Sequence, residues 1–157
     1  MKVRTINLRT LLPSLLLPII VGAAGAIVTA SGMEAYKLLN KPPLVPPGWV
    51  FSVVWTVLYI IMGYSAYLVK SSKCYDKQSA MQVYYIQLAL NFIWVLVFFR
   101  FGLLWLSAII LLLLTAAVIF TMLRFLECDT FAGRLLIPYV IWCLFALYLN
   151  VATAIIN

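Results

Sequence analysis

The chain has 157 residues, of which 66% are hydrophobic and 10% are charged, and its formal net charge at pH 7 is +7. Soluble globular domains carry roughly 25% charged residues, so this composition is typical of a protein embedded in lipid. The basic residues are spread over short segments between long apolar runs. This distribution excludes nucleic acid as a partner, because no basic domain is present to bind it.

Charged residues divide the sequence into five charge-free runs, which cover residues 10–33, 42–69, 78–99, 101–123 and 135–157. A helix needs about 20 apolar residues to span the hydrocarbon core of a bilayer. We therefore predict an all-α integral membrane protein, a bundle of five transmembrane helices that forms a single domain over residues 1–157. The helices are expected at residues 10–32, 48–69, 79–99, 102–124 and 133–156.

The first run also has the features of a secretory signal, because three basic residues precede an apolar stretch that ends in small residues. The small residues from Gly22 to Ala26 would equally allow another helix to approach closely. We interpret this run as the first transmembrane helix.

A proline-rich loop is predicted at residues 33–47, between the first two helices. Its four prolines, Pro42, Pro43, Pro46 and Pro47, fix φ and supply no amide donors. The segment from Lys41 to Gly48 is therefore expected to be an extended strap, with helix resuming only after Gly48.

Aromatic and amide side chains recur at helical spacing in three of the predicted helices. The shared faces are Trp55, Tyr59 and Met62 in the second helix, Gln87, Asn91, Trp94 and Phe98 in the third, and Tyr139, Trp142, Ala146 and Asn150 in the fifth. If these faces converge, they enclose a cavity suited to a large planar apolar molecule. The alternatives are ordinary core packing for the tryptophans and an interhelical hydrogen bond for Asn91.

Other aromatic residues lie near predicted helix ends, namely Trp49, Tyr64, Tyr67, Tyr84, Tyr85 and Trp105. Aromatic side chains are enriched at membrane interfaces, so we assign this group to interfacial belts without a further function.

Lys and Arg residues are distributed unequally between the two predicted sides of the membrane. The N-terminal side has eight, Lys2, Arg4, Arg9, Lys70, Lys73, Lys77, Arg124 and Arg134, and the other side has three, Lys37, Lys41 and Arg100. The positive-inside rule then predicts a cytoplasmic N-terminus and an external C-terminus in a bacterial cell membrane.

Residues for catalysis or metal binding are sparse. Cys74 and Cys128 fall in loops on the predicted cytoplasmic side, where thiols stay reduced, and Cys143 lies inside the fifth helix. The sequence has no histidine and no metal-ligand spacing, so no metal site and no required cofactor are predicted. Hydrolysis and ion-coupled transport are disfavoured, because the helices lack a general base and lack ionisable groups near their centres.

The assembled motifs resemble one family, the translocator proteins or tryptophan-rich sensory proteins (TspO/MBR, relatives of the peripheral-type benzodiazepine receptor). The resemblance lies in Tyr36, NKP at Asn40 to Pro42, the pair Pro46 and Pro47, WVFSVVWTVLY at Trp49 to Tyr59, QLALNFIWVLVFF at Gln87 to Phe99, and PYVIWCLFALYLN at Pro138 to Asn150.

This resemblance implies a five-helix bundle, often a homodimer, that binds porphyrins and similar planar hydrophobic ligands under the first loop. Carried over by position, the ligand-binding residues are Tyr36, Pro47, Trp55, Asn91, Trp94, Trp142 and Ala146. Some relatives degrade protoporphyrin in light and oxygen, and this would assign catalytic roles to Trp55, Trp142 and Tyr36. Porphyrin would then be the ligand or the substrate.

Two departures from the family pattern limit these expectations. Leu44 stands where relatives often have an aromatic residue in the loop, and no basic residue follows Tyr148, so a sterol site there is not implied. We keep two alternatives to a porphyrin sensor: a passive carrier of porphyrin or another hydrophobic metabolite, and an accessory subunit of another membrane protein.

Overall fold

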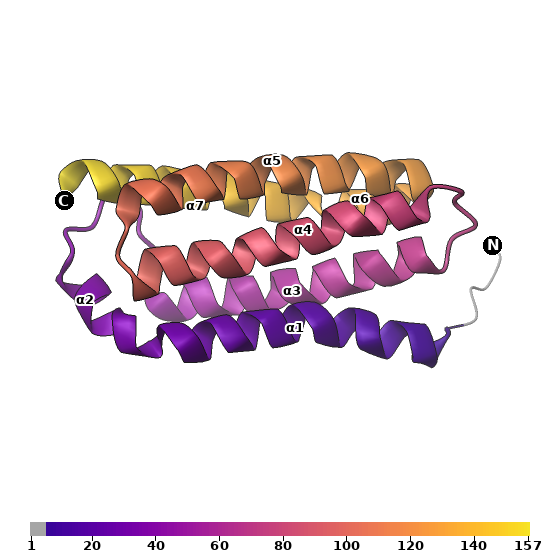
Figure 1. Ribbon diagram of the computed structural model, residues 1–157, viewed down its shortest axis with the longest axis horizontal. Helices are drawn as coiled ribbons and strands as arrows, with labels where there is room; N and C mark the ends of the chain where they lie inside the picture. The colour runs from indigo at the N-terminus through magenta and orange to yellow at the C-terminus, as the bar shows by residue number, and fades with distance from the viewer. Residues whose placement is uncertain (1–5) are drawn as a thin grey trace.

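Long α-helices account for most of the described residues, 6–157, in this computed structural model (Figure 1). The elements are α1 (Leu8–Thr29), the 3₁₀ turn η1 (Ala30–Gly32), α2 (Met33–Leu38), α3 (Gly48–Lys70), α4 (Lys77–Val95), the π-helical turn η2 (Leu96–Arg100), α5 (Leu104–Cys128), α6 (Thr130–Leu135) and α7 (Ile137–Ile156). Within the described residues, five helical segments are long and apolar enough to cross a membrane. The predicted all-α membrane bundle is confirmed.

The five long helices lie side by side and run along the long axis of the bundle (Figure 1). α1 packs along α3, α4 packs along α5, and α5 packs along α7. The short helix α6 lies against α3 and α5. Because consecutive long helices run in opposite directions, the loops gather at the two ends of the bundle.

Small residues bring α1 close to its neighbours, as expected for a helix of the bundle. A Cβ atom added to Gly22 would lie 2.2 Å from the ring of Tyr59 in α3. A Cβ atom on Gly63 of α3 would lie 2.7 Å from the Cα atom of Leu15 in α1. Asn7 begins α1 by accepting a hydrogen bond from the backbone of Arg9, which satisfies one of the free amide donors at the helix start.

The predicted loop at residues 33–47 is partly wrong, because Met33–Leu38 forms the helix α2. Prolines restrict the backbone only from the residue before Pro42 onward, so they leave the preceding segment free to be helical. An ion pair between Glu34 and Lys37, with 2.8 Å between Oε1 and Nζ, spans one turn of α2. α3 begins at Gly48, as predicted.

The prediction of interfacial belts is wrong for two tyrosines. Tyr84 is only 1% exposed and stacks on Phe125 with 5.7 Å between ring centroids, and Tyr67 is 6% exposed. Trp49 and Trp105 are exposed as expected. A ring near a helix end reaches the interface only from the outer face of its helix, and a position in sequence does not specify that face.

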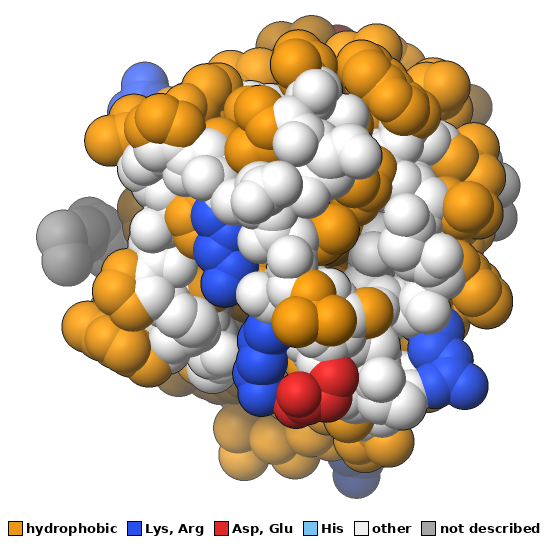
Figure 2. All heavy atoms as spheres, turned by 90° about the vertical axis from the view of Figure 1, so that its left-hand side faces the viewer, with side chains coloured by type: hydrophobic (Ala, Val, Ile, Leu, Met, Phe, Trp, Pro, Cys, Tyr) orange, Lys and Arg blue, Asp and Glu red, His pale blue; other side chains and the backbone are white. Residues whose placement is uncertain are grey.

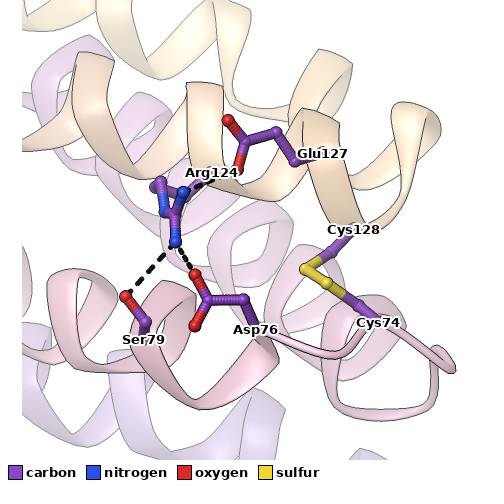
Figure 3. A network of polar contacts seen from close by, with 6 residues as sticks. All are labelled: Cys74, Asp76, Ser79, Arg124, Glu127 and Cys128. Atoms are coloured by element: carbon purple, nitrogen blue, oxygen red, sulfur yellow. Dashed lines mark hydrogen bonds and ion pairs between the residues drawn. A yellow bond between two sulfur atoms is a disulfide. The ribbon is translucent and has the colours of Figure 1, made fainter.

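The structure differs from the prediction for Cys74 and Cys128, since it joins the two expected thiols in a disulfide (Figure 3). The cysteines are 54 positions apart in sequence, but the packing of α4 along α5 brings the turn before α4 next to the end of α5. Arg124 lies beside them and pairs with Asp76 and Glu127, which joins the same two segments (Figure 3).

The charged residues separate to the two ends of the bundle as the sequence predicts. Lys70, Lys77 and Arg134 lie at the end where α1 begins. Figure 2 shows the opposite end, formed by α2, the proline loop and the C-terminus, where basic side chains stand among apolar ones. Lys2 and Arg4 lie outside the described residues.

Candidate functional site

Tyr36 stands at the loop end of the bundle, because α2 packs against η2 at the end of α4. Its ring centroid lies 5.7 Å from that of Phe98 and 5.1 Å from that of Phe99, both in η2. Lys41 Nζ lies 5.4 Å from the centroid of the Tyr36 ring. The π-helical turn η2 widens α4 here and presents two phenylalanine rings toward α2.

Trp55 lies at the centre of an aromatic cluster inside the bundle. Its ring centroid is 6.1 Å from Phe51, 5.7 Å from Tyr59, 5.8 Å from Trp94 and 6.1 Å from Tyr139. Phe51, Trp55 and Tyr59 share one face of α3 because they are four residues apart. The predicted aromatic faces of α3, α4 and α7 therefore converge.

A buried chain of hydrogen bonds crosses the bundle below this cluster. Tyr59 donates its hydroxyl to Asn91 Oδ1 at 2.8 Å, and Asn91 Nδ2 donates to the hydroxyl oxygen of Tyr139 at 3.3 Å. Tyr139 in turn donates to Gln87 Oε1 at 2.8 Å. Asn91 and Tyr139 are fully buried. Asn91 therefore links α3, α4 and α7, which is the interhelical role that the sequence left open.

Trp94 is held by a second set of polar contacts. Its indole Nε1 donates to Asn150 Oδ1 at 3.0 Å, and Asn150 Nδ2 donates to the backbone oxygen of Leu104 at 3.0 Å. Trp94 is 2% exposed. These bonds fix the plane of its ring between α3 and α7.

A small pocket remains between the loop and the bundle. Its lining residues are Tyr36, Val45, Phe51, Trp94, Phe98, Phe99, Ala146, Leu149, Asn150 and Thr153. Its volume is about 30 Å³, which is room for about two water molecules. The converging rings thus fill most of the predicted cavity themselves. A large planar ligand would have to separate rings or lift the loop.

The other predicted site residues lie at different distances from this pocket. Trp55 does not line the pocket but contacts two residues that do, Phe51 and Trp94. Asn91 lies one turn of α4 before Trp94. Trp142 stands beside Phe51, with 5.7 Å between ring centroids. The structure does not bring Pro47 into the pocket: it is exposed at the start of α3.

Leu44 also lies outside the pocket. Its side chain is 76% exposed, and its backbone has φ of +70°, a left-handed conformation that is uncommon for leucine. The neighbouring Val45 lines the pocket instead. The residue of the proline loop that faces the pocket is thus Val45, one position after Leu44, which the sequence suggested.

Two tryptophans of the site have unused hydrogen-bond donors. Among the described residues, Trp55 Nε1 and Trp142 Nε1 are buried and have no hydrogen-bond partner. Trp94 shows the contrast, since its indole is bonded to Asn150. Buried polar groups without partners are uncommon, so these donors are suited to an acceptor on a bound molecule.

Hydrogen bonds from α7 and from the residue that follows it hold the proline loop over the pocket. The side-chain amide of Asn157 accepts from the backbone N–H of Asn40 and donates to its backbone oxygen, both at 2.9 Å. Tyr148 donates its hydroxyl to the backbone oxygen of Pro43 at 3.2 Å. We refer to these three contacts as the loop latch.

The sequence did not single out Phe51, Phe99 or Asn157. Phe51 had a usable signal, because it precedes Trp55 by four residues on the same helix face. Phe99 reaches the pocket only because η2 is a π-helical turn, which shifts the helix faces by part of a turn.

Comparisons with known proteins agree over nearly the whole chain. Residues 14–156 match the family described as TspO/MBR. The chain is 32% identical over 152 residues to a tryptophan-rich protein TspO of Archaeoglobus fulgidus, covering 96% of this chain and 99% of that protein. It is 36% identical over 132 residues to a tryptophan-rich sensory protein of Cereibacter sphaeroides, covering 82% of each. It is 36% identical over 126 residues to the human translocator protein, covering 78% of this chain and 75% of that protein.

Proposed function

The chain belongs to the TspO/MBR family and is an integral membrane protein, and from this premise we propose that it binds tetrapyrroles such as protoporphyrin and thereby senses or regulates porphyrin. The binding site is the aromatic cluster below the proline loop. Other planar hydrophobic ligands would occupy the same site.

The aromatic cluster around Trp55 is the observation that carries this proposal. Aromatic rings from three helices surround Trp55. A planar ligand can replace one of these ring–ring contacts with a contact to its own face, at little cost in free energy. The unpaired Nε1 donors of Trp55 and Trp142 supply hydrogen bonds that an apolar ligand with oxygen or nitrogen acceptors would accept. Lys41 stands at the pocket mouth over Tyr36, within reach of an acidic group at the edge of a ligand.

Protoporphyrin is expected to quench the tryptophan fluorescence of the purified protein and to saturate at one equivalent per chain. Trp55→Phe combined with Trp142→Phe removes two indole donors but keeps two aromatic faces, so binding measured by porphyrin absorbance should be largely retained, with a modest loss of affinity. The same double variant should lose any light- and oxygen-dependent change in the porphyrin spectrum, because phenylalanine is a far poorer electron donor than indole. Trp105→Phe, which alters an exposed ring outside the cluster, is the matched control.

Non-saturating quenching in the parent protein would contradict tetrapyrrole binding. If the double variant bleaches porphyrin as fast as the parent, the tryptophans have no catalytic role. Protoporphyrin flux into sealed vesicles without a spectral change would support the passive carrier instead.

The same proposal includes a homodimer in a bacterial cell membrane, with the N-terminus in the cytoplasm. This orientation rests on the excess of Lys and Arg at the end where α1 begins. The end that carries the Cys74–Cys128 disulfide would then face a reducing compartment.

The orientation predicts the redox state of this cysteine pair in living cells. Cells quenched with acid and treated with a maleimide polymer should show Cys74 and Cys128 as thiols, and air-oxidised purified protein should show them bonded. Cys143 is buried and provides the internal reference for a thiol that is labelled only after unfolding. A disulfide already present in growing cells would place this end in an oxidising compartment and reverse the proposed orientation.

A further inference from the structure

An open space lies on the side of the bundle, between α3 and α7, and it is larger than the pocket under the loop. We call it the lateral groove. It is lined by Val53, Val54, Val57, Leu58 and Ile61 of α3 and by Pro138, Ile141 and Trp142 of α7. Its volume is about 370 Å³, against about 30 Å³ for the pocket under the loop.

The groove exists because α3 and α7 do not pack closely against each other, although each packs along another helix of the bundle. At the charged end α6 fills the gap, where Ser65 of α3 donates its hydroxyl to the backbone oxygen of Ala132 at 2.7 Å. At the loop end, the rings of Phe51 and Trp142 close it. Its side chains are all apolar apart from one indole nitrogen, so the groove is suited to contact with lipid hydrocarbon.

The lateral groove and the inner pocket meet at the contact between two rings. Phe51 lines the pocket, Trp142 lines the groove, and their centroids are 5.7 Å apart. No hydrogen bond fixes the Trp142 ring, whereas Trp94 on the far wall is bonded to Asn150. Rotation of the Trp142 ring therefore breaks no polar contact among the described residues.

We infer that the planar ligand enters the inner pocket from the bilayer through the lateral groove, with Phe51 and Trp142 as the gate between them. This inference rests on the proposed function. The indole N–H of Trp142 engages an acceptor on the ligand as it arrives, because this donor is unpaired at the inner wall of the groove. The route accepts molecules that are already dissolved in lipid and excludes water-soluble ones.

The alternative route, through the proline loop, is closed by three hydrogen bonds. Asn157 and Tyr148 hold the loop at Asn40 and Pro43. Entry from water would require these bonds to break, and entry through the groove would require only the rings to turn. The contact between Phe51 of the pocket and Trp142 of the groove also favours the ligand itself as the occupant of the groove.

Filling the groove tests this route. Val57→Trp and Ile141→Trp each place a large ring in the groove, at positions that are 48% and 62% exposed and therefore need no repacking of the core. Leu112→Trp, at a 56% exposed position of α5 away from the groove, is the matched control. Val57→Ala widens the groove. Association and dissociation of protoporphyrin between vesicles and reconstituted protein are followed by stopped-flow fluorescence.

We expect both rates to fall by about tenfold in the filled variants and to rise in Val57→Ala, with the dissociation constant unchanged, because a gate alters rates and not the bound state. Unchanged rates in both filled variants would overturn the route. Weaker binding with faster dissociation would make the groove a binding site instead, and loss of the dimer would make it an interface between copies; either result overturns the inference. No saturable binding in the parent protein would refute the proposed function itself, which separates the two failures.

Discussion

Replacing Gly32 by alanine is expected to abolish porphyrin binding and to lower the thermal stability of the bundle. A Cβ atom at Gly32 would lie 1.8 Å from the backbone oxygen of Phe99 and 3.0 Å from the Cα atom of Arg100. Both neighbours are backbone, so no side chain can turn away to relieve the overlap. Small-to-large changes in packed sites cost about 1–3 kcal/mol and occasionally more, and backbone overlap places this one at the upper end.

The loss of binding follows from the position of Gly32 next to η2. Moving η2 away from Gly32 displaces Phe98 and Phe99, which pack on Tyr36 and line the pocket. Thermal unfolding in detergent and the protoporphyrin titration measure the two effects separately.

Gly48→Ala is the matched control for this prediction. A Cβ atom at Gly48 meets nothing within 4 Å, and the position begins a helix. This variant should keep the parent's unfolding temperature and dissociation constant. An unfolding temperature in Gly32→Ala equal to that of the control would show that η1 and η2 are not in contact as described.

Asn91→Leu is expected to lower the free energy of unfolding by about 1–3 kcal/mol, since it removes one hydrogen bond to each of two tyrosines. Tyr139 keeps Gln87 as a partner, whereas Tyr59 is left with a buried hydroxyl that has none among the described contacts. Single interhelical hydrogen bonds in membranes average about 0.6 kcal/mol, so most of the loss comes from the unpaired hydroxyl.

A double-mutant cycle with Tyr59→Phe checks the assignment. Removing the Tyr59 hydroxyl as well should restore part of the stability lost in Asn91→Leu, because the unpaired group disappears. If Asn91 instead serves mainly to contact ligand, Asn91→Leu would weaken protoporphyrin binding while leaving the unfolding transition unchanged.

The membrane fold could be predicted from the sequence because hydrocarbon imposes a minimum length on each charge-free run. The runs 42–69 and 101–123 each coincide with most of a helix that is long and apolar enough to span the bilayer, α3 and α5. The converging aromatic faces were predictable for a related reason: Trp55, Asn91 and Trp142 each recur with partners at helical spacing.

The remaining features depend on which helices are neighbours, which periodicity does not encode. The Cys74–Cys128 bond forms because α4 lies along α5, and Tyr84 is buried because Phe125 of α5 faces it. The small volume of the pocket depends on the fit between ring planes from three helices, which no spacing rule describes. Phe51 could have been found from its position four residues before Trp55.

The closed pocket under the proline loop has a thermodynamic consequence for any ligand that binds there. A space of about 30 Å³ means that the form able to hold a large ligand is a minority state in the absence of that ligand. If that state is populated at about 1%, the measured dissociation constant is about a hundredfold weaker than the intrinsic one. Two homologues with identical pocket linings could therefore differ widely in affinity, because contacts outside the pocket can change the population of the open form without touching the ligand.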